Sequence, residues 1–250
     1  MSSYQAHTAQ ILTAGLFRED LTRFRHIERF LKTPELNATL AAGTPNAAEI
    51  AASFAANQNF ELIGTNAADA DSDQVIGGGV QLSTAGADAD QIILQPHQDS
   101  GQSALATIKF GTDHKSAWAS VFDTGASVAS VILMGGLKLT NTPVIATDAH
   151  QAFFRYEDSG NLQCVYSVGG TDYTVDSGVA VAASTRYITA IEIDDDRYVN
   201  FHINGERVHR STVALTDAIN LIPYFGVEAN TAAVKTATLR CLAVAKSYTD

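Results

Sequence analysis

The clearest pattern of hydrophobic and polar positions lies in residues 187–208, YITAIEIDDDRYVNFHINGERV. Apolar and polar residues alternate in VNFHI, and this period of two predicts a strand with one buried face. Asn204-Gly205 follows, the pair that most readily takes positive φ at both central positions of a hairpin turn. Residues 187–193 form an earlier β-rich run that ends in the acidic turn formers 194–196. The segment predicts a three-stranded antiparallel meander.

The chain after residue 58 has the pattern of an all-β domain. Runs rich in Val, Ile, Thr, Tyr and Phe recur between Gly, Asp, Asn and Ser, at spacings typical of a sandwich. The predicted strands are residues 60–64, 75–83, 91–95, 105–110, 118–122, 128–139, 152–156 and 162–168, with more from residue 173 to the end. We therefore expect a β-sandwich domain over residues 59–250.

Residues 1–58 are predicted to form a separate helical arm. Apolar residues within 16–32 recur at helical spacing and would form one stripe. The stripe consists of Phe17, Leu21, Phe24, Ile27 and Leu31. Pro34 would end this helix, because the residue before a proline avoids the helical region. The stripe either folds back on the sandwich or docks on another chain, and docking would make it the assembly surface.

The β-rich runs also carry a family resemblance. The strings YITAIEID, YVNFHINGERV, LIPYFGVEAN and KTATLRCLAVAKSY resemble the second half of a laminin-G-like or concanavalin A-like jelly-roll sandwich. Upstream, VIGGGVQLSTAGADADQIILQP, VILMGGLKLT and QAFFRYE resemble the version of that fold found in structural proteins of tailed bacteriophages. The resemblance covers residues 59–248. It implies an all-β, antiparallel concanavalin A-like jelly roll with a short α-helical N-terminal arm.

Composition and charge restrict the partners that we expect. The formal net charge is −11, and residues 1–50 hold equal numbers of acidic and basic side chains, so the sandwich carries the excess. An acidic body disfavours nucleic acid, which needs a basic surface. The sequence has no apolar run of about 18 residues, so we expect no membrane span. The start, MSSYQAHTAQ, does not have the form of a secretory signal.

One acidic group resembles a catalytic motif. Glu192, Asp194 and Asp196 alternate along one strand end, and EIDDD resembles the Glu-x-Asp-x-Glu strand of laminarinase-type glycoside hydrolases. Retaining hydrolysis needs two carboxyl groups about 5 to 5.5 Å apart. The third position here is Asp rather than Glu, and the trio falls at a predicted turn. These departures favour a solvated acidic turn over catalysis.

A second acidic group resembles the start of a calcium loop. Asp69, Asp71 and Asp73 alternate in ADADSDQ, and Asp88 and Asp90 repeat the pattern in GADADQIIL. An EF-hand would need Gly at position 6 and Glu at position 12, and neither is present. Acidic turns before strands are the ordinary interpretation, and a lectin-type calcium site is the alternative.

The remaining candidate motifs favour structural roles. Cys164 and Cys241 lie in apolar runs without metal-ligand spacing, which predicts two buried thiols. Gly77-Gly78-Gly79 is not followed by the Lys-Ser/Thr of a phosphate loop and fits a bulge or close packing. The seven histidines have no HExxH spacing, and no GxSxG motif is present.

These observations predict a protein that is not an enzyme, has no cofactor, and attaches to a larger assembly through its arm. The resemblance implies a bacteriophage virion structural protein, such as a capsid decoration, head-fibre or tail-associated subunit. Such a protein would be made in the host cytoplasm, contact other virion proteins and form a homo-oligomer, with a trimer favoured. The alternative is a carbohydrate-binding, lectin-like module that recognises surface glycans, and a glycoside hydrolase ranks third.

Overall fold

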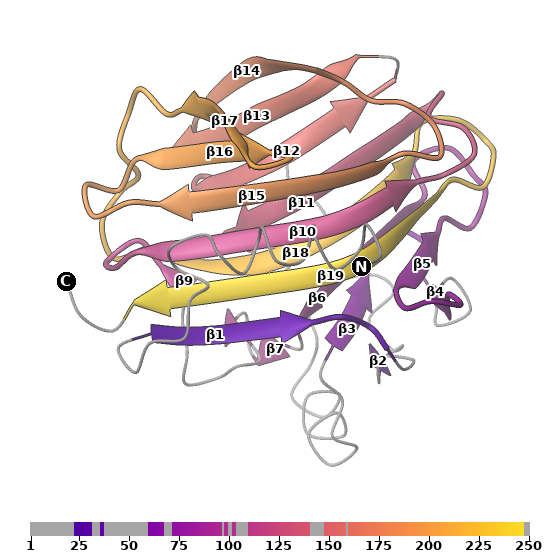
Figure 1. Cartoon of the computed structure of the whole chain (residues 1–250), viewed down its shortest axis with the longest axis horizontal. Helices are drawn as coiled ribbons and strands as arrows, with labels where there is room; N and C mark the ends of the chain where they lie inside the picture. Colours follow the sequence, from indigo (N-terminus) through magenta and orange to yellow (C-terminus); the bar gives the residue numbers. More distant parts are fainter. Residues whose placement is uncertain are drawn as a thin grey trace.

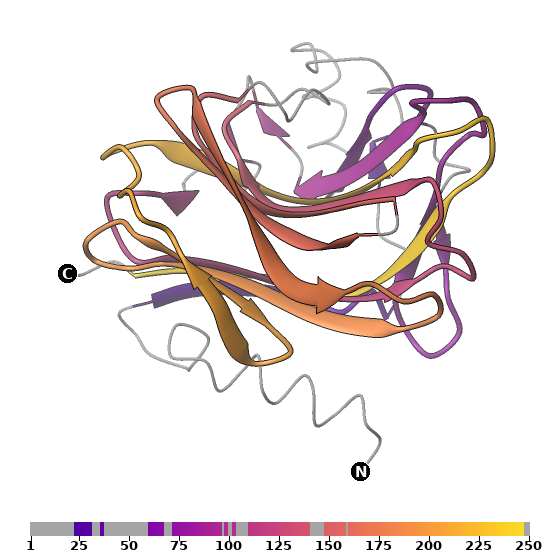
Figure 2. The same cartoon turned by 90° about the horizontal axis from the view of Figure 1, so that it is seen from above.

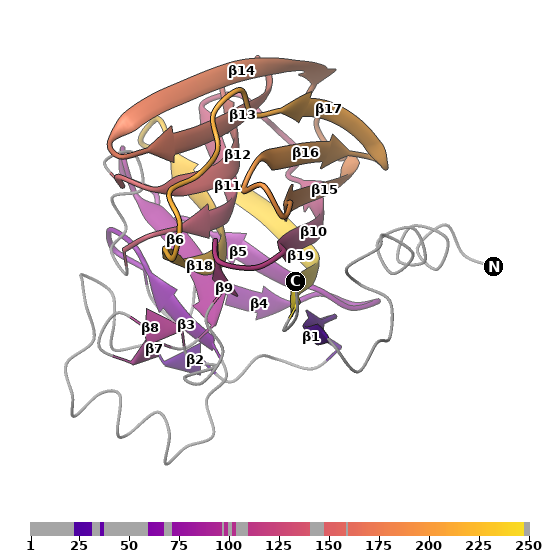
Figure 3. The same cartoon turned by 90° about the vertical axis from the view of Figure 1, so that its left-hand side faces the viewer.

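A computed structural model describes residues 23–31, 36–37, 60–67, 72–96, 98–99, 102–103, 110–140, 148–158 and 160–247. Within these ranges the chain forms strands and no helix, so no described helix could span a membrane. Two large sheets pack face to face, as Figure 1 and Figure 3 show. The predicted two-layer β-sandwich is confirmed.

Sheet A has the order β17-β16-β15-β10-β19-β5-β4, with β1 also paired to β19. Its strands are β1 (Arg23–Glu28), β4 (Ser72–Gln74), β5 (Val80–Ser83), β10 (Ser116–Thr124), β15 (Arg186–Ile193), β16 (Val199–Ile203), β17 (Glu206–Arg210) and β19 (Thr236–Ser247). Every pairing in sheet A is antiparallel.

Sheet B has the order β14-β13-β12-β11-β18-β6-β3-β2, with β9 also paired to β18. Its strands are β2 (Leu36–Asn37), β3 (Phe60–Ile63), β6 (Gln91–Pro96), β9 (Phe110–Gly111), β11 (Val131–Lys138), β12 (Gln151–Glu157), β13 (Asn161–Val168), β14 (Thr171–Ala180) and β18 (Asn220–Ala229). Only the β2–β3 pair is parallel among the described strands of this sheet. A separate hairpin joins β7 (Gln98–Asp99) to β8 (Gln102–Ser103).

The hydrophobic core lies between the two sheets, which Figure 2 shows as stacked layers. Trp118 and Phe122 of β10 point inward from sheet A, and Phe225 of β18 points inward from sheet B. The rings of Phe122 and Phe225 lie 5.2 Å apart. Residues of a strand point alternately to its two faces. In each sheet, the residues next to these core residues along the strand therefore point away from the other sheet. We call those two surfaces the outer face of sheet A and the outer face of sheet B.

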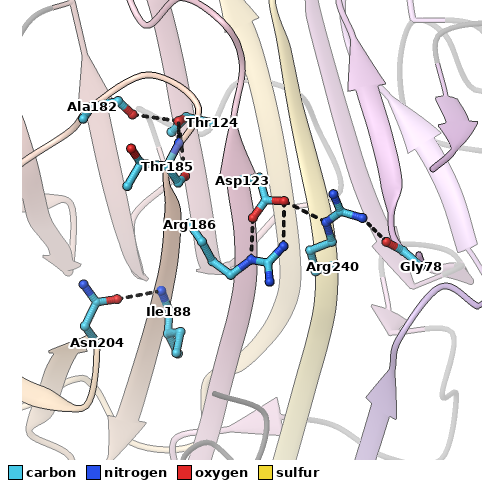
Figure 4. A network of polar contacts seen from close by, with 9 residues as sticks. All are labelled: Gly78, Asp123, Thr124, Ala182, Thr185, Arg186, Ile188, Asn204 and Arg240. Atoms are coloured by element: carbon cyan, nitrogen blue, oxygen red, sulfur yellow. Dashed lines mark hydrogen bonds and ion pairs between the residues drawn. The ribbon is translucent and has the colours of Figure 1, made fainter. Parts of the chain in front are cut away.

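The predicted meander is confirmed as β15, β16 and β17. Asn204 and Gly205 have φ values of 52° and 92°, as a type I′ turn requires. The turn is fixed to β15, because the Ile188 N–H donates to Asn204 Oδ1 at 3.0 Å (Figure 4). The Asn204 N–H also donates to the Ile188 carbonyl oxygen at 2.7 Å.

The predicted N-terminal helix is wrong over residues 23–28, which form strand β1. β1 pairs with residues 242–247 of β19, whereas β5 pairs with residues 236–239 on the same edge. The physical reason is a long-range contact: residues 242–246 pair with β10 on one side, and without β1 the backbone groups on their other side would lack partners. The spacing of apolar residues within 16–32 is a local pattern, so it could not predict this pairing with β19.

A second correction concerns the predicted strand 75–83. Only residues 80–83 form β5, and Gly77, Gly78 and Gly79 lie in the preceding turn with φ between 90° and 114°. The Gly79 N–H donates to the Phe30 carbonyl oxygen at 3.0 Å. The glycines therefore form the β4–β5 turn instead of a bulge within a strand, because side chains disfavour these φ values.

Candidate functional site

The outer face of sheet B carries an unusual set of buried side chains. Its apolar members come from the six neighbouring strands β13, β12, β11, β18, β6 and β3: Ile63, Ile93, Ile132, Met134, Phe153, Val165 and Tyr224. The rings of Phe153 and Tyr224 lie 6.4 Å apart and flank Gly136, which pairs with both residues. A Cβ on Gly136 would lie 2.7 Å from the Cβ of Phe153, so glycine permits this close approach. The two rings form a buried aromatic pair in the middle of the sheet.

A row of polar side chains crosses the same face beside this aromatic pair. Gln151 of β12 pairs with Ser167 of β13, and Ser167 pairs with Asp172 of β14. The Gln151 Nε2 donates to Ser167 Oγ at 2.9 Å, and Ser167 Oγ donates to Asp172 Oδ1. Lys138 of β11 is buried, and its ammonium lies 5.5 Å from the centre of the Tyr224 ring. A buried ammonium is rare unless something compensates its charge.

Two polar atoms of this face have no hydrogen-bond partner within the described part of the chain. They are Tyr224 Oη and Gln151 Oε1, and both are buried. Burial raises the pKa of Tyr224 well above its ordinary value, and the charge of Asp148 raises it further. The hydroxyl therefore stays protonated and can donate a hydrogen bond. A buried polar atom without a partner costs about 1–3 kcal/mol, so both atoms call for a ligand or a solvent partner.

The other end of this face is acidic and more exposed. Glu228 of β18 and Glu157 of β12 pair with Ile132 of β11 from opposite sides. The Gln91 Nε2 donates to Glu228 Oε2 at 2.9 Å, and Arg155 forms an ion pair with Glu157 at 2.7 Å. Desolvation raises the pKa of Glu228, and the charge of Glu157 adds to the increase, although the Gln91 hydrogen bond and Arg155 oppose it.

A different polar cluster occupies the outer face of sheet A (Figure 4). The Arg186 Nε donates to Asp123 Oδ1 at 2.6 Å, and the Arg240 Nε donates to Asp123 Oδ2 at 2.8 Å. Arg240 also donates to the Gly78 carbonyl oxygen. Burial alone would raise the pKa of Asp123, but the hydrogen bonds and charges of both arginines outweigh it and lower the pKa. The cluster therefore joins β10, β15, β19 and the β4–β5 turn.

The predicted assembly stripe does not form one face within the described residues. Phe24 and Ile27 lie on opposite faces of β1: Phe24 is 6.1 Å from the Phe110 ring, and Ile27 packs on small apolar residues of the outer face of sheet A. Leu31 follows β1 and is exposed. Phe17 and Leu21 lie outside the described residues, so an assembly role for the stripe stays a prediction.

The acidic trio lies at the β15–β16 connection. Glu192 belongs to β15, and Asp194 and Asp196 lie in the turn that follows. Asp194 accepts hydrogen bonds from the Tyr198 N–H at 2.8 Å and from Arg210 at 2.9 Å. Its carboxylate therefore caps the turn, which is the structural role that the sequence favoured.

The calcium-like aspartates give no metal site in the described residues. Asp90 accepts hydrogen bonds from the Ala87 N–H and from Asn66, and these two contacts lower its pKa. Asp69 and Asp71 lie outside the described residues. No group of three or more His, Cys, Asp or Glu suited to a metal occurs in the described ranges.

Cys164 and Cys241 are buried free thiols, as predicted, and burial raises the pKa of each to about 12.

Comparisons with known proteins show the fold but no family. No protein-family model matches the sequence, and no curated protein resembles it closely enough to show a relationship. A protein of unknown function from Shewanella oneidensis MR-1 has a similar structure, with a TM-score of 0.57 and 13% identity over 100% of this chain and 97% of that one. A β-glucanase from Bacillus licheniformis has a TM-score of 0.54 and 13% identity over 88% of this chain and 97% of that one.

The carbohydrate recognition domain of Emp46p is also similar, with a TM-score of 0.51 and 8% identity over 83% of this chain and 94% of that domain. This chain therefore has a concanavalin A-like β-sandwich fold. The predicted jelly-roll resemblance is confirmed at this level. No similarity bears on a bacteriophage origin, a virion location or an oligomeric state, and these stay predictions from the resemblance.

The prediction that the chain is not an enzyme needs correction. It assumed that the chain has no notable polar groups on its sheets, but the outer face of sheet B carries Lys138, Gln151 and Tyr224 at one end and Glu157 and Glu228 at the other. The fold also occurs in a β-glucanase, so it does not exclude catalysis. The sequence missed these residues because they belong to three different strands. One signal was available: Lys138 ends an otherwise apolar strand, VILMGGLK.

Proposed function

We propose that the protein binds a polysaccharide chain on the outer face of sheet B. The observation that carries this proposal is the pair of buried atoms without hydrogen-bond partners, Tyr224 Oη and Gln151 Oε1, on one face. Sugars supply hydroxyl groups that both donate and accept. Tyr224 and Gln151 are at most 1% exposed, so binding has to uncover them. A ligand hydroxyl could then accept from Tyr224 and donate to Gln151, which would satisfy both atoms.

The surrounding residues suit the same ligand. Binding sites commonly combine apolar surface with a few polar groups that set orientation. Once uncovered, Phe153 and Tyr224 would supply the aromatic surface, and Lys138 and the Gln151–Ser167–Asp172 row would supply polar contacts. The similar structures support this proposal in kind, since they include a β-glucanase and a carbohydrate recognition domain. Glycan binding is compatible with a virion role.

The proposal can be tested by calorimetric titration of the full chain with soluble mixed-linkage β-glucan and, separately, with an anionic uronic acid polymer. We expect one of them to bind and Tyr224→Phe to weaken that binding about tenfold, the equivalent of one hydrogen bond of about 1.4 kcal/mol. Tyr156→Phe is the matched control, because the Tyr156 hydroxyl donates to the Val128 carbonyl oxygen inside the core. Absence of binding to both polymers, or equal effects of the two variants, would overturn the proposal.

A further inference from the structure

The edge strands of the two sheets meet at one end of the sandwich. β17 ends sheet A and β14 ends sheet B, and the two strands contact each other (Figure 1 and Figure 3). Tyr173 of β14 stacks on Tyr166 of β13 with ring centres 4.8 Å apart, and Tyr166 stacks on His209 of β17 with ring centres 6.0 Å apart. The ring of Phe201 in β16 also lies 6.0 Å from that of His209. We call these four residues the ring clasp, because they join the last strands of both sheets.

The register of the β16–β17 pair sets the inward position of His209. His209 pairs with Phe201, a buried core residue, so both side chains lie on the inner face of sheet A. Beyond this pair the register shifts, and Val208 is an extra residue of β17 that also packs against the core. Among the described strands β17 has a neighbour in its sheet on one side alone. Its position therefore depends on these inward contacts.

The segment after β17 is tied to the ring clasp as well. The Thr212 N–H donates to Tyr166 Oη at 3.2 Å, and the hydroxyl oxygens of the two residues lie 3.1 Å apart. The Ser211 N–H donates to the Val199 carbonyl oxygen at 2.8 Å. The amides of Ser211 and Thr212 therefore report whether this end of the sandwich is closed.

The ring clasp suits a neutral histidine. The Nε2 atom of His209 is buried and has no hydrogen-bond partner in the described part of the chain. A neutral imidazole can keep its proton on Nδ1 and leave only a lone pair on Nε2. An imidazolium carries a proton on both nitrogens, so its Nε2–H would be a buried donor without an acceptor. Burial accordingly lowers the pKa of His209 below its ordinary value of 6.5.

The neighbouring strands present no negative charge to His209. The other members of the ring clasp are two phenols and a phenyl ring, which are neutral at pH 7. The carboxylates of β14 belong to Asp172 and Asp176, which lie on the outer face of that strand. There they accept hydrogen bonds from Ser167 and Asn161.

The charged residues of β17 itself do not compensate an imidazolium either. Glu206 is exposed at the hairpin turn, three residues before His209. Arg207 donates to Asn200 Oδ1 at 3.4 Å, and Arg210 forms an ion pair with Asp194 at 2.9 Å. Both arginines carry the same charge as a protonated His209, so they cannot stabilise it.

We propose that the ring clasp is an acid-sensitive switch: protonation of His209 releases β17 and Thr212 from Tyr166 while the centre of the sandwich stays folded. At neutral pH the uncharged ring holds the two edge strands together. Because the folded-state pKa of His209 is lowered, the clasp is at full strength above pH 6.5 and weakens as pH falls from 6.5 toward the lowered value. Acid therefore uncovers the core at this end, and neutral pH covers it again.

The test is an NMR titration of the labelled full chain from about pH 7.5 to about pH 4.5, the range around the ordinary histidine pKa. The ring signals of His209 give its titration, and amide exchange, corrected for the intrinsic effect of pH, gives protection factors. We expect His209 to titrate below pH 6.5. Over the same pH range the protection factors of Ser211 and Thr212 should fall at least about tenfold. Those of Ala119 and Val121 in the central strand β10 should not change.

Two variants assign the transition to one residue. His209→Phe keeps a ring but cannot ionise, so its Ser211 and Thr212 amides should stay protected in acid. His202→Gln is the matched control: burial and the charge of Arg207 also lower the pKa of His202, but this side chain lies on the other face of β16. The control should open in acid as the wild type does.

Several results would overturn the switch. They are a His209 that titrates at pH 6.5 or above, amides that stay protected after it has titrated, a simultaneous loss of protection in β10, and an equal acid loss in His209→Phe. If His209→Phe does not fold, the wild type decides alone, because the ring titration and the loss of amide protection must share one midpoint.

Discussion

The outer faces of the two sheets differ in whether their polar groups have hydrogen-bond partners. On sheet A, Asp123 accepts hydrogen bonds from Arg186 and Arg240 and joins three strands. On sheet B, the hydroxyl of Tyr224 and the amide oxygen of Gln151 are buried without partners in the described part of the chain. A satisfied network stabilises the fold, whereas an unsatisfied one weakens it and persists where function requires it. Under our proposal, the paired groups of sheet A stabilise the fold and the unpaired groups of sheet B bind the ligand.

The largest expected effect is structural and lies beside sheet A. Phe30 follows β1, is buried, and its ring lies 5.5 Å from that of Phe60. Phe30→Ala should lower the free energy of unfolding by about 3–4 kcal/mol, because it leaves a cavity in the core. Polysaccharide affinity of the folded protein should not change. Urea denaturation measures the loss, and the neighbouring control Leu31→Ala should change stability by less than about 0.5 kcal/mol, because Leu31 is exposed.

Asp123→Asn should lower the free energy of unfolding by about 2–3 kcal/mol at pH 7, because two arginines lose their charged partner. The folded-state pKa of Asp123 is lowered, so its stabilising contribution is complete above the ordinary pKa near 3.8 and is lost as pH falls through the lowered value. The difference between the variant and the wild type should therefore shrink in acid. Asp195→Asn, which breaks an exposed ion pair with Lys115, should cost less than about 1 kcal/mol.

The sequence predicts an element of this fold well when the residues that determine it are close together in the chain. Asn204-Gly205 and the alternation of VNFHI act locally, and they predicted the β15–β17 meander correctly. β1 depends on the unpaired edge of β19, more than 200 residues away in the chain, and local spacing misread it as a helix. The candidate site could not be predicted for the same reason, since its residues come from separate strands and meet only through the sheet register.

Tyr224→Phe should raise the free energy of unfolding by about 1 kcal/mol in the absence of ligand, because the variant no longer buries an unpartnered hydroxyl. Tyr156→Phe should lower it by about 1 kcal/mol, because that hydroxyl donates to the Val128 carbonyl oxygen at 2.9 Å. Urea denaturation of both variants measures the two effects. Equal losses in the two variants would mean that the Tyr224 hydroxyl is paired and that the contrast between the faces does not hold.

Glu228→Gln should give the smallest change, a gain of about 0.5 kcal/mol at pH 7 for a partly exposed group. The folded-state pKa of Glu228 is raised, so the wild type is most stable below the ordinary pKa near 4.5 and loses stability as pH rises through the raised value. The variant cannot ionise and avoids this loss. The gain should vanish at pH 4, and a variant that is less stable than the wild type at pH 7 would contradict the role of desolvation.

The most direct test of the central claim is an NMR titration of the isotopically labelled chain with an oligosaccharide of the polymer that binds. If the outer face of sheet B is the ligand site, the backbone amide signals of its central strands should shift, including those of Gly136, Gln151, Phe153 and Gly226. The signals of Asp123, Arg186 and Arg240 on sheet A should stay in place. Shifts confined to sheet A or to the β15–β16 turn would contradict the claim.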